Sequence, residues 1–106
     1  MTNLGFGFIP IHPGEVLKDE LKSRHITQRQ FADRLGLKYS VVNEIVKGRR
    51  PVSTRTALMI EAALDIPADS LLQLQLKYDL QTARADKALA ERLISIESFS
   101  SSPALV

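Results

Sequence analysis

The chain has 106 residues, of which 44% are hydrophobic and 25% are charged, as expected for one globular domain with its own core. It contains no cysteine, which excludes disulfides, thiolate metal sites and thiol catalysis and is typical of a reducing cytoplasm. The formal net charge is only +2, so composition alone does not indicate a nucleic-acid partner. We expect no signal peptide and no membrane-spanning segment, because no long apolar run follows a basic N-terminal region.

The positive charge is concentrated in the middle third of the chain. Residues 24–55 contain eight basic residues and two acidic ones, whereas residues 65–106 contain four basic and six acidic ones. A local excess of cations is expected on a face that contacts phosphates. A surface that binds no nucleic acid can show the same asymmetry by chance, so the charge distribution needs support from the sequence pattern.

The chain begins with a predicted flexible arm over residues 1–11, where glycines and a proline argue against a strand. A first helix is predicted from Pro13 to about residue 24. Proline suits a first helical turn, and Glu15 favours the positive end of the helix dipole. Leu17 and Leu21 lie four residues apart and predict the buried face of this helix.

The next two helices are predicted to be short and very close together. Thr27 and Gln30 form a capping-box pattern that begins the second helix, and Gly36 suits the left-handed conformation that ends it. The spacing of Val42 and Ile45 then predicts a third helix over residues 38–47. Two helices joined by a short turn containing glycine are typical of a helix-turn-helix unit.

A helix-turn-helix unit has definite steric requirements, and this segment meets them in register. Gly36 permits the sharp turn, and Ala32 is small where the second helix of the pair must pass close to the first. Val42 and Ile45 are placed to be buried, so that the recognition helix stands rigidly on its support. The remaining positions of that helix are polar and are expected to reach outward.

A fourth helix is predicted to begin after Ser53, a good N-cap, with Ala57, Ile60 and Leu64 as its core line. A fifth helix is predicted from about Ala68, continuing without interruption into the segment 81–97. Its first half carries too many apolar residues for one stripe, so more than one of its faces must be covered.

The predicted fold is therefore all-α, with five helices and an extended C-terminal helix. We divide the chain into a flexible arm (1–11), a DNA-binding domain (12–80), a helical extension (81–97) and a disordered tail (98–106).

The third helix is predicted to place its N-terminal residues in the major groove of DNA. The candidates for base reading are Lys38, Tyr39, Ser40, Asn43 and Glu44. Asn can pair bidentately with adenine, Glu can accept from cytosine, and Lys can donate to guanine. The candidates for phosphate contact are Gln28, Lys47, Arg49, Arg50 and Arg55. The alternative is a solvated helix face beside a basic loop, but the turn chemistry, Ala32 and the local charge together favour DNA binding.

Three segments carry a resemblance to a known family. Residues 12–64 resemble the lambda repressor-like helix-turn-helix family, also called the XRE family. The segments IPIHPGEVLKDEL, GRRPVSTRTALMIEAAL and LLQLQLKYDL together resemble its HigA-type antitoxins, with the HPGE opening at 12–15 and the LxLQxxYDL element at 72–80. The resemblance implies a dimer that represses its own operon and neutralises a HigB-type toxin, a ribosome-dependent mRNA endonuclease.

The sequence departs from this family at the start of the recognition helix. Lys38 stands where a capping Ser or Thr is usual, and Tyr39 stands where Arg is frequent. The base sequence that relatives recognise therefore does not carry over to this chain.

Apolar side chains near both ends of the chain provide candidates for protein contacts. The dimer-interface candidates are Leu72, Leu76 and Leu80, whose alternative role is in the core of the domain. We expect one side of this helix to pack on the first and fourth helices and the other to form a homodimer seam. The candidates for toxin contact are Leu89 and Leu93 in the extension, which could instead extend the dimer seam, and Phe6 and Phe8 in the arm.

The remaining polar residues do not form a catalytic or metal-binding pattern. No carboxylate stands at a metal-ligand spacing from His12 or His25, and His12 is expected to bond the backbone at the start of its helix. We therefore predict a protein that is not an enzyme and has no metal, cofactor, membrane or small-molecule substrate. A stand-alone transcriptional regulator is the main alternative to an antitoxin, and a protein-interaction module that has lost DNA binding is a third.

Overall fold

The structure, a computed structural model, describes residues 10–101, and within these residues the only regular elements are helical. The helices are α1 (Pro13–Ser23), α2 (Gln28–Leu35), α3 (Tyr39–Val46), α4 (Thr54–Leu64), α5 (Ala68–Arg84) and α6 (Lys87–Ile94), followed by a short 3-10 turn at Phe99–Ser101. The all-α class predicted from the sequence is confirmed over this part of the chain, and the first four helices lie close to their predicted bounds.

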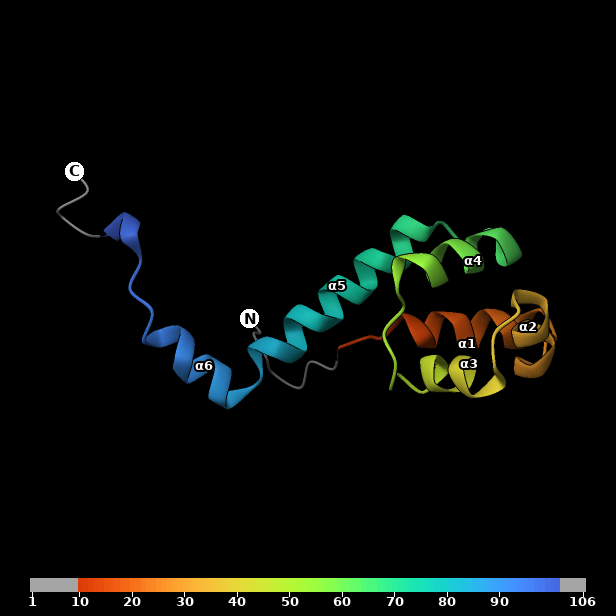
Figure 1. The fold of residues 1–106 in the computed structure, drawn as a ribbon, viewed down its shortest axis with the longest axis horizontal. Coiled ribbons are helices and arrows are strands. Elements are labelled where there is room, and N and C mark those ends of the chain that lie inside the picture. Colours follow the sequence, from red (N-terminus) through yellow and green to blue (C-terminus); the bar gives the residue numbers. More distant parts are fainter. Residues whose placement is uncertain (1–9, 102–106) are drawn as a thin grey trace.

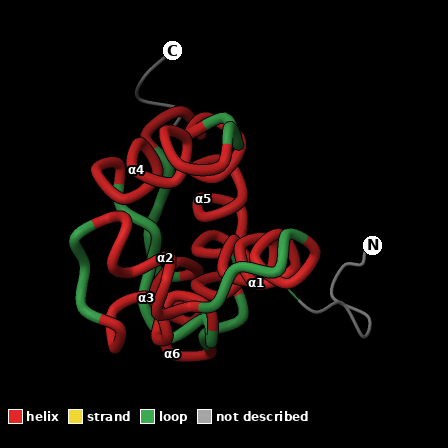
Figure 2. Tube along the Cα trace, turned by 90° about the vertical axis from the view of Figure 1, so that its right-hand side faces the viewer, coloured by secondary structure: helices red, strands yellow, loops and turns green. Residues whose placement is uncertain are grey.

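Helices α1 to α4 and the beginning of α5 form one bundle, from which the rest of α5 extends and leads to α6 (Figure 1). The packed pairs are α2 with α3 and α4, α1 with α3 and α5, and α4 with α5, while α6 packs against α5. Viewed from the end of the molecule, α4 and α3 lie on different sides of the bundle (Figure 2). In the side view, α6 lies at the opposite end of the molecule from α2 and α3 (Figure 1).

The hydrophobic core contains residues from all five of the helices α1, α2, α3, α4 and α5 and from the loop before α4. It consists of Leu17, Leu21, Phe31, Ala32, Val42, Ile45, Val46, Val52, Ala57, Ile60, Leu64, Ala68 and Leu71. The core line predicted for α4 belongs to this set, so that prediction is confirmed. Complete burial of a Leu or Ile side chain stabilises a fold by about 1.5–3 kcal/mol. The amphipathic pattern therefore provides most of the force that holds these helices together.

The predicted N-terminal caps are present at α2 and α4. The hydroxyl of Thr27 accepts the N–H of Gln30 at 3.0 Å, and the Gln30 side chain accepts the N–H of Thr27 at 2.9 Å. The hydroxyl of Ser53 accepts the N–H of Thr56 at 3.2 Å. Each bond satisfies a backbone donor that has no partner within its helix.

The ends of α2 and α3 are set by two glycines. The backbone of Gly36 has a φ of 71° and that of Gly48 a φ of 73°, both in the left-handed region that favours glycine. After α3, the N–H of Arg49 turns back to the carbonyl oxygen of Glu44 at 2.8 Å. This bond closes the last turn of α3 and fixes where the following loop begins.

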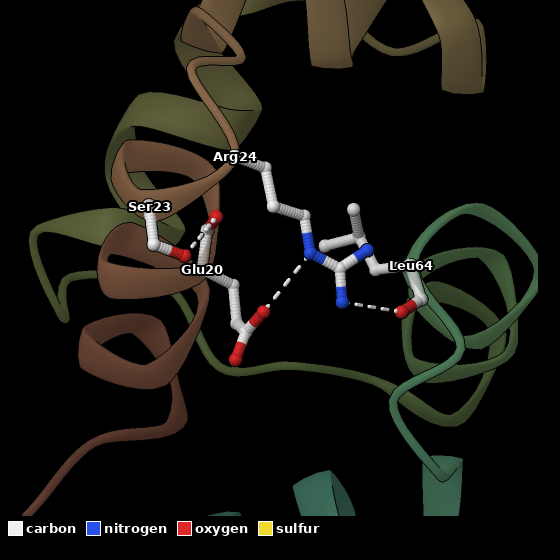
Figure 3. Close-up of polar contacts among 4 residues, drawn as sticks. All are labelled: Glu20, Ser23, Arg24 and Leu64. Atoms are coloured by element: carbon white, nitrogen blue, oxygen red, sulfur yellow. Dashed lines mark hydrogen bonds and ion pairs between the residues drawn. The ribbon is translucent and has the colours of Figure 1, made fainter.

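Arg24 ties the end of α1 to the end of α4 (Figure 3). Its Nε donates to the Glu20 carboxylate at 3.0 Å and its Nη2 donates to the carbonyl oxygen of Leu64 at 2.8 Å. A cation is favourable at this position because the C-terminus of a helix carries the negative end of its dipole. The contact holds α1, which supports α3, against the other half of the bundle.

The prediction of one uninterrupted helix from residue 68 to about residue 97 is wrong. Helix α5 ends at Arg84, and Asp86 then adopts an extended conformation with φ −72° and ψ 116°. Its carboxylate accepts the N–H of Leu89 at 3.1 Å and thereby begins α6. Asp is a strong N-cap residue, so it favours a new helix start over continuation of the old helix. The predicted five helices are therefore six in the described residues.

Candidate nucleic-acid interface

Helices α2 and α3 form the predicted helix-turn-helix unit. Ala32, Val42 and Ile45 are each only 1% exposed, so the contact between the helices is made by the residues that the sequence predicts. The buried face of α3 packs on α1 and α2. The opposite face of α3 is therefore presented to solvent on a rigid support, as a recognition helix requires.

A hydrogen-bond network connects the two helices on the solvent side. The Nδ2 of Asn43 donates to the Oε1 of Gln28 at 3.0 Å and makes a longer contact of 3.5 Å to the hydroxyl of Tyr39. Since Nδ2 carries two protons, one can remain on Gln28 while the other acts with Oδ1 on a base edge. Asn43 is thereby held in one orientation without a ligand, and this lowers the entropic cost of any contact that its side chain makes.

Arg29 is a further member of this face, beyond the contacts expected from the sequence. Its guanidinium lies 4.5 Å from the centroid of the Tyr39 ring. Such a cation–π contact holds both side chains in place at the start of α3. Arg29 is one of the basic residues of segment 24–55, so the local excess of positive charge in the sequence did indicate that it could belong to this face. Its position over the ring depends on the turn between the helices, which the sequence pattern does not specify.

Helix α3 begins without a side-chain cap. Lys38 occupies the N-cap position and makes no capping hydrogen bond with its side chain. Lys38 and Ser40 are both exposed. The N-terminal amides of α3 are therefore not bonded by the side chain at the cap, and an anion such as a phosphate is the natural partner for them.

Two of the predicted contact residues are paired with each other. Nη2 and Nε of Arg50 donate to Oε1 of Glu44 at 2.7 and 2.9 Å. Both side chains are about half exposed, so this ion pair contributes only about 0–1 kcal/mol and can open when a phosphate is near. The other predicted phosphate-contact cations, Lys47, Arg49 and Arg55, are exposed and have no carboxylate partner among the residues that the structure describes.

The HPGE segment packs directly on the end of α3. Gly14 is buried where α1 crosses α3, and a Cβ atom on it would lie 1.8 Å from the carbonyl oxygen of Ile45. The Nδ1 of His12 accepts the N–H of Gly14 at 2.9 Å, as the sequence predicts, and its ring lies edge-on to Tyr78 at 4.8 Å. The left-handed Gly48 lies against the same imidazole, with its Cβ position 3.6 Å from the Cβ of His12.

The pKa of the buried His12 makes the stability of this junction depend on pH. Burial lowers this pKa below the usual 6.5, and it outweighs Asp79 and Glu15, which act to raise it. The unfolded chain therefore takes up a proton at a higher pH than the folded chain does. We expect the contribution of His12 to the free energy of unfolding to be complete above pH 6.5 and to decrease as the pH falls below it.

Urea unfolding of the wild type and of His12→Asn between about pH 7.5 and 5 measures this effect. Asparagine is also a good N-cap but does not titrate. The difference in unfolding free energy, wild type minus variant, should decrease on acidification and level off below the folded-state pKa. A difference that stays constant with pH would contradict the assignment.

The dimer-interface candidates on α5 differ in exposure. Leu72 is partly buried against the core, whereas Leu76 is 60% and Leu80 is 42% exposed. The two exposed leucines line a shallow groove together with Gln73, Lys77, Gln81 and Arg84. Among the candidates for toxin contact, Leu89 and Leu93 are 38% and 50% exposed on α6, whereas Phe6 and Phe8 lie outside the described residues.

The described residues contain no group of three or more His, Asp or Glu side chains that could hold a metal ion. None of the helices in the same part of the chain is long and apolar enough to cross a membrane.

The fold and the polar face of α3 define the class of protein. The chain belongs to the helix-turn-helix family of the XRE type, whose helix-turn-helix family model matches residues 17–71. The chain is 35% identical over 89 residues to virulence-associated protein I of Dichelobacter nodosus, a match that covers 83% of this chain and 82% of that relative.

Two solved structures of antitoxins show the same fold. The antitoxin HigA of Pseudomonas aeruginosa with the higBA promoter is 34% identical to this chain with a TM-score of 0.77, over 86% of this chain and 99% of that one. The antitoxin GraA in complex with its operator is 33% identical with a TM-score of 0.74, over 86% and 92% of the two chains.

Proposed function

We propose that this protein is the antitoxin of a type II toxin–antitoxin module. In this proposal it binds operator DNA as a dimer, represses its own operon in the cytoplasm, and neutralises a HigB-type mRNA endonuclease. The observation that supports it most strongly is the pre-formed Gln28–Asn43 pair on the outer face of a rigidly supported α3. The similarity to antitoxins solved with a promoter or an operator supports the same function.

The proposed contacts separate base reading from phosphate binding. In the proposed complex, Asn43 reads a base, most readily adenine, while Lys38, Tyr39, Ser40 and Glu44 lie along the same groove. Lys47, Arg49, Arg50 and Arg55 contact phosphates at the end of α3 and the beginning of α4, with Gln28 at the start of α2. Phosphate contacts fix the register of the protein on the duplex, and the side chains of α3 then select the sequence.

The dimer is expected to bring two copies of α3 to successive major grooves. Half-sites of a palindromic operator would then lie about 34–36 Å apart. In this proposal the exposed Leu76 and Leu80 of α5 form the seam, and Leu72 joins it at the edge of the core. Leu89 and Leu93, at the far end of the molecule from α2 and α3, are proposed to contact the toxin together with Phe6 and Phe8.

Titration against duplex DNA tests the proposal. The purified protein is titrated at two salt concentrations with the DNA upstream of its own gene and with a scrambled duplex. We expect tight, salt-sensitive binding that prefers the upstream DNA. Asn43→Ala should lose roughly 1–3 kcal/mol of that preference per half-site, because it removes a bidentate contact to a base.

The same titration has an outcome that rejects the proposal. Weak and equal binding to both duplexes by the wild type would exclude an autorepressor and leave a protein-interaction module as the better function. Ser70→Ala, at an exposed position of α5, serves as the matched control and should bind as the wild type does.

The second candidate is a stand-alone transcriptional regulator without a toxin. The relative from Dichelobacter nodosus carries a name that does not mention an antitoxin. A neighbouring gene for a small basic toxin, and co-purification of its product with this chain, would support the antitoxin. Operator binding without any such partner would support the regulator.

A further inference from the structure

The loop that leads from α3 to α4 is held at its far end by a side chain of α5. The Oε1 of Gln75 accepts the N–H of Val52 at 2.8 Å. Gln75 is only 6% exposed and Val52 is only 3% exposed, so water cannot readily replace this bond. A buried backbone N–H that loses its partner is costly, which makes the bond a strong constraint on the loop.

The amide of Gln75 is itself held in one orientation. Its Nε2 donates to the Oδ1 of Asp79, one helical turn later, at 2.9 Å. Because Nε2 donates to this carboxylate, Oε1 faces Val52. A rotation of the amide that swapped Nε2 and Oε1 would break both hydrogen bonds. Asp79 thus determines which atom Gln75 presents to the loop.

The same loop carries cations that the proposed function assigns to phosphates. It leaves α3 through the bond from the Arg49 N–H to Glu44, and it contains Arg49 and Arg50 between that point and Val52. The ion pair of Arg50 with Glu44 is half exposed and constrains the loop weakly. The bond to Gln75 is therefore the buried polar constraint on the C-terminal side of these two arginines.

We propose that Gln75 is a positioning residue for DNA binding: through Val52 it holds the loop, and with it Arg49 and Arg50, in the geometry that phosphate contact needs. The inference rests on the proposed function and adds to it a dependence of the DNA face on α5. The geometry of a phosphate contact is sensitive to small displacements of the backbone, since the guanidinium must reach the oxygen at hydrogen-bond distance.

Substitutions that move the negative charge from position 79 to position 75 test the proposal. Gln75→Glu keeps an acceptor for Val52 but places a second carboxylate against Asp79, and like charges at this distance repel. We expect its affinity for the upstream DNA to fall at least about tenfold, with a flatter salt dependence, as phosphate contacts are lost. Adding Asp79→Asn restores a donor for the new carboxylate at position 75. This double variant has the wild-type net charge and should bind within about twofold of the wild type.

Two controls separate positioning from general stabilisation. Ser70→Glu adds the same negative charge at an exposed position of α5 that does not line the groove of the proposed dimer seam, and it should leave the affinity unchanged. Thermal unfolding is measured on every variant, and binding is measured well below the lowest Tm. A Gln75→Glu variant that melts earlier but binds DNA with the wild-type affinity and salt dependence would show a structural role only and overturn the proposal. Failure of Asp79→Asn to restore binding would overturn it as well.

Hydrogen exchange of the Val52 amide keeps this test distinct from that of the proposed function. Without DNA, the amide should be protected in the wild type and in the double variant and should exchange faster in Gln75→Glu. If the wild type does not prefer the upstream DNA but shows this exchange pattern, the proposed function is rejected and the loop anchor stands. Unchanged exchange of Val52 in Gln75→Glu would reject the anchor itself.

Discussion

Replacement of Gly14 by alanine is expected to destabilise the protein strongly. The new Cβ would lie 1.8 Å from the carbonyl oxygen of Ile45, and backbone cannot rotate away as a flexible side chain can. Alanine gains at most about 1 kcal/mol of helix propensity over glycine. Overpacking typically costs about 1–3 kcal/mol and occasionally more, and a contact this close to backbone belongs at the upper end of that range, so the net effect is destabilising. For a domain of this size we expect Tm to fall by roughly 10 °C or more.

The same change should also impair DNA binding, because relief of the clash moves α1 away from the end of α3. Gly36→Ala is the matched control: it adds the same methyl group, but nothing lies within 4 Å of its Cβ position. Its cost comes only from the left-handed backbone, with φ 71°, and is about 1–2 kcal/mol. Thermal unfolding of both variants by circular dichroism compares the two costs. Equal losses in Tm would contradict the close contact between α1 and α3.

The parts of the fold that could be predicted from the sequence are those that local chemistry determines. The capping box at Thr27, the cap at Ser53 and the left-handed turn at Gly36 each involve residues within four positions of one another. The break between α5 and α6 also has a local cause, the cap at Asp86. The apolar spacing continues through this break, and periodicity alone does not detect a cap.

The candidate site was predictable in its position but not in its contacts. The outward face of α3 follows from the burial of Val42 and Ile45. In contrast, the bond from the Val52 N–H to Gln75 joins residues 23 positions apart, and the pair of Asn43 with Gln28 joins residues 15 apart. Such contacts depend on how whole helices pack, and no spacing in the sequence specifies them. The close approach of Gly14 to Ile45 is of the same kind.

Removal of two cations that are proposed to contact phosphates is expected to have the largest effect on DNA affinity. Arg49 and Arg55 are exposed and have no carboxylate partner among the described residues, so both charges are available to phosphates. In the proposed dimer, Arg49→Ala/Arg55→Ala would remove four of the proposed phosphate contacts. The slope of the logarithm of the association constant for DNA against the logarithm of the salt concentration should become shallower by about 0.9 for each contact, roughly 3 to 4 in all. At about 0.15 M salt, taken as a reference condition, the same relation gives a loss of affinity on the order of 10³-fold.

This loss should be nearly the same for the operator and for a scrambled duplex, because phosphates carry no sequence information. Asn43→Ala should behave in the opposite way, with a smaller loss that falls mainly on the operator. Lys87→Ala/Arg92→Ala removes the same charge from α6, at the far end of the molecule, and controls for net charge alone. If this control loses as much affinity as Arg49→Ala/Arg55→Ala, the attraction is a general effect of charge, and the loop after α3 and the start of α4 do not form the phosphate-binding element.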